Sequence, residues 1–232
     1  MVGNPDSTRT YLNPFLHILA VFIKDAKTSF SIIVNETNSI NLLYINHPRM
    51  SRNNPNFHNE FRQHNNELKH QESVRRVALL SFANLCGIIS NLIWPSTGKP
   101  NNSVEYKRKV DRKNHLMEFF PENCYSNLTK HFRNFLEHND EKMDEWTAKS
   151  KHHNIAFGTG TGIANLDVWL DFHPSTLSVT YYSNGSSKTA DLNSMYLDIE
   201  KLPPQIVKAL DTIMDSPTGW NSPSIRSIIE EE

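Results

Sequence analysis

The chain lacks the residues that would mark a disulfide-stabilised or zinc-binding protein. Its 232 residues include only two cysteines, Cys86 and Cys124, and no Cys-x-x-Cys pair. Two cysteines cannot form a disulfide framework, and without paired thiols the common structural zinc sites are excluded. The simplest interpretation is a protein of a reducing compartment, so we expect a cytoplasmic location. Cys86 lies among apolar residues with no activating group, and we expect it in the core.

The chain also lacks an excess of charge of either sign. Lys and Arg number 24 against 25 Asp and Glu, which gives a formal net charge of -1. A protein with this balance has no overall positive field that would bind nucleic acid without selectivity. Any nucleic-acid partner would therefore have to be held by a local basic patch.

Signals for secretion or membrane insertion are missing as well. The first residues, MVGNPDSTRTYLNP, do not show the basic-then-apolar order of a signal peptide. The most apolar run, residues 15–23, is interrupted by His17 and followed by Lys24 and Asp25. Since a membrane-spanning helix needs about 20 apolar residues, we expect a soluble protein with no membrane contact.

The first 150 residues are predicted to be helical. Asn13-Pro14 favours a helix start, and apolar residues then recur at steps of three and four to about Val34. Residues 40–45 fit either a strand or a helix end, and the Asn-, His- and Pro-rich residues 47–66 are predicted as loop. Three more helices are expected: residues 67–94 ended by Pro95, residues 104–118 capped by Ser103, and residues 127–149 capped by Ser126.

The later part of the chain alternates apolar and polar residues with the period of a strand. Leu166, Val168, Leu170 and Phe172 alternate with polar residues or Trp169, and residues 177–181 alternate again. Turn signals lie at residues 173–175 and at Asn184-Gly185. We expect a small β-hairpin or three-stranded meander whose Leu/Val face packs on the helices. Pro203-Pro204 should begin a last helix to about Met214, and residues 215–232 are predicted to be a tail.

The predicted fourth helix contains the sequence HFRNFLEHNDEKMDEW, residues 131–146, which has two distinct faces. On a helical wheel at about 100° per residue, with Arg133 at zero, Asn134 lies near 100° and His138 near 140°. Apolar residues occupy the opposite arc, between roughly 200° and 300°; they are Phe132, Phe135, Leu136, Met143 and Trp146. An arginine, an amide and a histidine thus share the polar face with Glu137, Glu141 and Glu145.

Arg133-Asn134-Phe135-Leu136-Glu137-His138 resembles the R-x(4–6)-H signature of HEPN domains, in the form with Asn directly after Arg. The longer run RNFLEHNDEKMDEW is similar to a pattern of bacterial HEPN-like proteins that have a β-hairpin after the motif helix. The resemblance covers roughly residues 12–150. It implies an α+β, mostly α fold: an antiparallel four-helix bundle over residues 12–150, a β-hairpin plus helix over residues 151–214 packed on it, and the tail.

The resemblance also implies a chemistry. Many HEPN domains are metal-independent ribonucleases that dimerise to bring two such motifs together. Histidine suits proton transfer at the 2′-OH because its pKa lies near neutrality, and arginine suits the phosphate because its planar fork donates in pairs. His138 would be the general base or acid, Arg133 the phosphate clamp and Asn134 a positioning group, with no cofactor or metal. Such enzymes serve as toxins or defence nucleases, with an antitoxin or another protein as a possible second partner.

Basic residues that could hold RNA lie on the second and third predicted helices. We take Arg75, Arg108, Arg112 and Lys113 as the substrate-binding set. The alternative for this cluster is an ordinary solvated helix face.

Other patterns in the chain are weaker. Arg52-Asn53 followed by His58 also fits the bare motif, but Pro55 and an Asn-rich stretch separate its ends. Residues 158–162 (GTGTG) lack the Lys-Ser/Thr ending of a phosphate loop. Three functions therefore stay open: the ribonuclease, a non-catalytic module that binds a nucleotide, RNA or protein, and a structural oligomerisation module.

Overall fold

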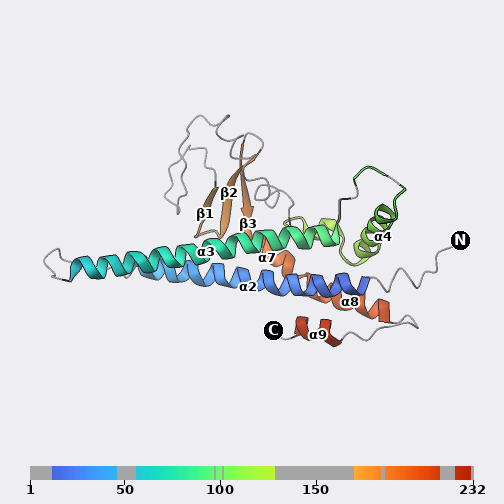
Figure 1. Cartoon of the computed structure of the whole chain (residues 1–232), viewed down its shortest axis with the longest axis horizontal. Coiled ribbons are helices and arrows are strands. Elements are labelled where there is room, and N and C mark those ends of the chain that lie inside the picture. Colours follow the sequence, from blue (N-terminus) through green and yellow to red (C-terminus); the bar gives the residue numbers. More distant parts are fainter. Residues whose placement is uncertain are drawn as a thin grey trace.

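The structure is a computed structural model, and it describes residues 12–45, 56–96, 98–100, 102–128, 170–183, 186–214 and 223–230. Within these ranges the fold is α+β and mostly helical, with one small antiparallel sheet, as predicted. Two long helices lie side by side along the molecule, the sheet lies over one of them, and shorter helices pack against the other (Figure 1).

The two long helices are α2 (Leu12–Ile45) and α3 (Phe57–Ile93), which run antiparallel (Figure 1). Their 34 and 37 residues correspond to lengths of about 50 Å and 55 Å. At mid-length Ser29 Oγ donates to Ser81 Oγ at 3.1 Å, and the Phe30 and Phe82 rings lie 5.4 Å apart. The core between them consists of small and branched apolar residues such as Leu16, Ile33 and Ile89.

Both long helices extend beyond their predicted limits. Residues 40–45 continue α2, so the helix-end interpretation of this run is correct. The loop predicted for residues 47–66 is wrong over residues 57–66, which form the first turns of α3. His58, the far end of the alternative motif, therefore lies on a helix, whereas Arg52 lies outside the described residues. At the other end α3 stops at Ile93, one residue before the predicted limit, ahead of Pro95.

The sheet has three antiparallel strands in the order of the chain, which confirms the predicted meander. Its strands are β1 (Leu170–His173), β2 (Ser178–Ser183) and β3 (Ser186–Asp191). Ser183 pairs with Ser186, so β2 ends and β3 begins on the two sides of the predicted turn. Val179 and Tyr181 are buried, which confirms for β2 that the apolar face packs inward. Val168 lies outside the described residues.

Three helices follow the sheet: α7 (Leu192–Glu200), α8 (Leu202–Met214) and α9 (Pro223–Glu230). All three contact α2. The helix expected at Pro203-Pro204 is confirmed as α8. The other two were not predicted, and the tail predicted for residues 215–232 is corrected over 223–230, where Ile225 is 1% exposed.

α4 (Val104–Phe119) begins as predicted, because the Ser103 side chain accepts the Tyr106 N–H at 3.1 Å. It lies near one end of α3 and also contacts α8 (Figure 1). A short 3-10 helix, η1 (Glu122–Tyr125), follows it.

One described helix, α3, is long and apolar enough to cross a membrane by length and composition alone. Of its most apolar 18-residue window, 56% is buried inside the fold, as in the core helix of a soluble protein.

Candidate functional site

The predicted catalytic residues Arg133, Asn134 and His138 lie in residues 129–169, outside the described residues. The same is true of the fourth helix and of Trp146 and Trp169. The structure does describe the chain on both sides of this stretch: the segment that ends at Leu128, and β1, which begins at Leu170.

The segment before the motif is held by an aromatic cluster. Trp94, Phe120 and Tyr125 are all buried; the Tyr125 ring lies 5.6 Å from Trp94 and 6.4 Å from Phe120. Trp94 Nε1 donates to the Phe120 carbonyl oxygen at 2.8 Å, which joins the end of α3 to the end of α4. Burial raises the pKa of the Tyr125 hydroxyl. Since Leu128 is also buried, the chain approaches the motif from a fixed position.

A buried carboxylate completes this anchor. Asp198 of α7 is 1% exposed, and its Oδ2 accepts the backbone N–H of Asn127 at 2.9 Å. Its Oδ1 accepts from Lys201 Nζ at 2.7 Å, so the buried charge is paired. Ser126 was predicted to cap a helix starting at residue 127. In the structure the N–H of Asn127 is instead satisfied by a side chain 71 positions away.

The four predicted substrate-binding residues do not form one surface. Arg75 is only 6% exposed, and its guanidinium carbon lies 4.8 Å from the centre of the Phe172 ring in β1. Burial lowers the pKa of Arg75, while the nearby Glu72 carboxylate opposes this shift. In this arrangement Arg75 holds the sheet against α3 by a cation–π contact, and its contact with a substrate stays a prediction.

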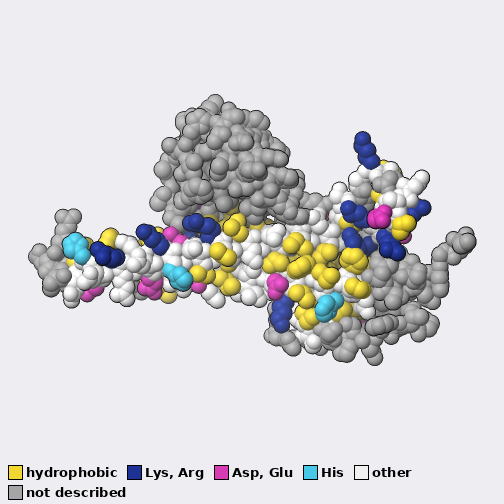
Figure 2. All heavy atoms as spheres, in the orientation of Figure 1, with side chains coloured by type: hydrophobic (Ala, Val, Ile, Leu, Met, Phe, Trp, Pro, Cys, Tyr) yellow, Lys and Arg dark blue, Asp and Glu magenta, His cyan; other side chains and the backbone are white. Residues whose placement is uncertain are grey.

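The other three residues lie on α4. Arg108 is exposed, Lys113 is half-buried, and Arg112 lies with its guanidinium carbon 4.3 Å from the centre of the Phe15 ring of α2. Figure 2 shows Lys and Arg side chains gathered around this helix. Lys107 and Lys109 are exposed on the same helix, although Glu105 and Asp111 are exposed beside them. α4 thus provides a local basic surface, and Arg112 also ties it to α2.

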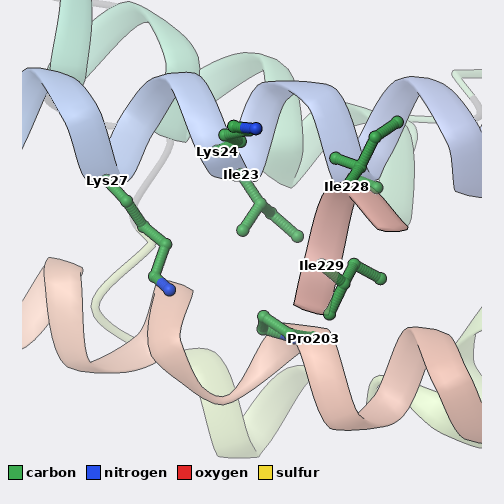
Figure 3. A pocket seen from close by; sticks show the side chains of 7 residues that line it. Ile23, Lys24, Lys27, Pro203, Ile228 and Ile229 are labelled. Carbon is green, nitrogen blue, oxygen red and sulfur yellow. The ribbon is translucent and has the colours of Figure 1, made fainter. Parts of the chain in front are cut away.

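A small groove lies between α2, α8 and α9 (Figure 3). Its walls are Ile23, Pro203, Ile228 and Ile229, with the lysines of α2 at the margin. Lys27 Nζ is bound to Glu200 Oε1 at 3.1 Å, which keeps this lysine within the fold. The groove is therefore a joint in the packing of α9. Within the part of the chain that the structure describes, no cluster of His, Cys, Asp and Glu could hold a metal ion.

No family model, curated protein or solved structure matches the chain. Its function is therefore inferred from its own residues.

Sequence reasoning missed Asp198, because nothing in the sequence near Asn127 points to a partner so far along the chain. The helix that carries it could have been found. Asp191 precedes Leu192, Met195 and Ile199, and its carboxylate accepts the N–H groups of Asn193 and Ser194. A capping residue followed by apolar residues at steps of three and four is the ordinary signal for a helix start.

Proposed function

We propose that this chain is a metal-independent endoribonuclease of the HEPN type, acting as a toxin or defence nuclease in the cytoplasm. The observation that carries the proposal is the Arg133-Asn134-x-x-x-His138 motif, which lies opposite the apolar stripe of its predicted helix. A motif placed away from the core is free to contact a substrate.

The chemistry follows from the three residue types. His138 removes the proton of a ribose 2′-OH, and the oxygen attacks the adjacent phosphorus while the bond to the 5′ oxygen breaks. Arg133 donates in pairs to the phosphate oxygens as negative charge develops, and Asn134 orients the phosphate or the imidazole. The products are a 2′,3′-cyclic phosphate and a 5′-hydroxyl. A two-fold dimer would supply a second histidine as the acid that protonates the leaving oxygen.

Two features of the described structure support this proposal without testing it. The chain before the motif is anchored by Tyr125 and Asp198, as a catalytic group on the following segment requires. The basic surface of α4 is joined to that segment by η1, so RNA held there would lie close along the chain to the motif.

The test is cleavage of labelled single-stranded or looped RNA in excess chelator. We expect the wild type to cleave, and His138→Ala or Arg133→Ala to lose roughly 10²–10⁴-fold in rate, the usual contribution of a general acid or base. Arg52→Ala and His58→Ala are matched controls that change the alternative Arg-Asn…His pattern, and both should retain wild-type activity. Cleavage that survives His138→Ala would refute the mechanism.

The second candidate is a non-catalytic module that binds a nucleotide, an RNA or a protein partner. The positions of Arg75 and Arg112 favour it, because two of the four predicted substrate contacts are engaged with Phe172 and Phe15 inside the fold. RNA that binds the wild type but is never cut, with binding lost in Arg108→Ala, would select this alternative.

A further inference from the structure

The outer face of α3 carries apolar residues that are not covered. Val77 is 65% exposed and Leu80 is 40% exposed, while Ile88 of the same helix is half-buried. The buried side of the helix is formed by other positions, among them Ala78, Phe82, Cys86 and Ile93. Figure 2 shows hydrophobic side chains gathered over α2 and α3 on the face in view.

This face of α3 has no charge. The sequence from Val77 to Trp94, VALLSFANLCGIISNLIW, contains no Asp, Glu, Lys or Arg. A helix face turned to water ordinarily carries charged and polar residues opposite its apolar stripe. A long uncharged face with exposed Val and Leu is instead the property of a contact surface.

The exposed residues form a stripe that is nearly symmetric about its centre. Val77, Leu80, Asn84, Ile88 and Asn91 follow one another at steps of three, four, four and three, within an arc of about 80° at 100° per residue. The stripe is about 21 Å long. Asn84, an exposed amide, stands at its midpoint, four residues from both Leu80 and Ile88.

From this symmetry we infer that the α3 stripe is a self-association face, which pairs antiparallel with the same stripe of a second copy about a two-fold axis at Asn84. In this register Leu80 meets Ile88 of the other copy twice, and the two Asn84 amides meet across the axis. An amide is both donor and acceptor, so two copies satisfy each other. A single asparagine in an apolar helix interface is a known means of fixing register.

The neighbouring helix widens the same face. Ser29 bonds to Ser81 at the seam between the helices, and the α2 residues on the Ser29 side include Ile18, 42% exposed, and Ile32, 36% exposed. Asp25 is exposed on this side too, at nearly the level of Asn84. Across the axis it approaches its own copy, so its charge weakens the pairing.

The register gives a charge-swap experiment. By sedimentation at micromolar concentration the wild type should be a dimer. Leu80→Glu and Ile88→Lys should each be monomers, because in either variant a charged side chain would meet an apolar partner twice. An equimolar mixture of the two variants should form a heterodimer, in which the introduced glutamate of one copy meets the introduced lysine of the other. Asp25→Asn should strengthen the wild-type dimer several-fold. Circular dichroism checks that every variant is folded.

Val104→Glu is the matched control, since Val104 is 60% exposed on α4 and should leave the dimer intact. A wild type that stays monomeric, a dimer that survives Leu80→Glu, or a mixture that does not associate would each overturn the inference. Sedimentation reads association and RNA cleavage reads catalysis, so the failure of this inference is distinguishable from the failure of the proposed nuclease.

Discussion

Asp198 is the residue through which the C-terminal helices reach the segment that bears the motif. It binds Asn127 directly and is itself buried, so its removal leaves the Asn127 N–H without its acceptor. We expect Asp198→Ala to lower the free energy of unfolding by about 2–3 kcal/mol, measured by urea denaturation. Asp198→Asn keeps an acceptor oxygen and should lose less. Lys201→Met removes only the exposed partner and should cost under about 1 kcal/mol. Equal losses in all three variants would contradict the role given to the Asn127 contact.

The two cysteines should differ sharply in reactivity. Cys124 is exposed, whereas Cys86 is 1% exposed, and burial raises the pKa of its thiol. A thiol reagent added to the folded chain should therefore modify Cys124 at once and Cys86 only as the protein unfolds. Mass spectrometry after brief labelling checks this, and rapid modification of Cys86 in Cys124→Ser would contradict it.

The raised pKa of Cys86 also predicts a pH dependence with a definite sign. Above the ordinary thiol pKa of 9.0, the unfolded chain releases this proton while the folded chain retains it. The free energy of unfolding should consequently fall as pH rises through this range. Cys86→Ala should lessen the fall, as measured by denaturation at two alkaline pH values. An unchanged slope in Cys86→Ala would mean that other groups account for the fall.

At the scale of elements, α9 shows how a short helix is stabilised by packing. Ile225 is 1% exposed, whereas Ile229 of the same helix is only half-buried. Removing the buried side chain leaves a cavity against the core, so Ile225→Ala should cost roughly 2–4 kcal/mol. Ile229→Ala is the matched control and should cost clearly less. Thermal unfolding of both variants checks the order, and an equal effect would contradict this packing.

Sequence patterns predicted elements wherever the pattern was local. The Ser103 cap, the helix end before Pro95 and the pairing of Ser183 with Ser186 depend on signals within a few residues, and each appears as expected. Residues 57–66 were misassigned because their polar composition resembles a loop, although they continue a helix whose later turns are packed on α2. α7 and α9 were overlooked although their apolar spacing was present.

At the scale of the whole molecule, the sequence could not predict which basic residues would lie together. Arg75 appeared to belong with the arginines of α4, but it lies beneath the sheet against Phe172. Its burial depends on β1, nearly a hundred residues along the chain. Contacts of this range depend on the assembled fold, and the same applies to Asp198 with Asn127.

The role of the 2′-OH is the central chemical claim, and one substrate pair tests it directly. In excess chelator, the purified wild type should cleave a labelled RNA and leave a 2′,3′-cyclic phosphate, while the same strand with 2′-O-methyl groups should stay intact because no oxygen can attack the phosphate. Cleavage of both strands, or cleavage that requires added divalent metal, would contradict the account.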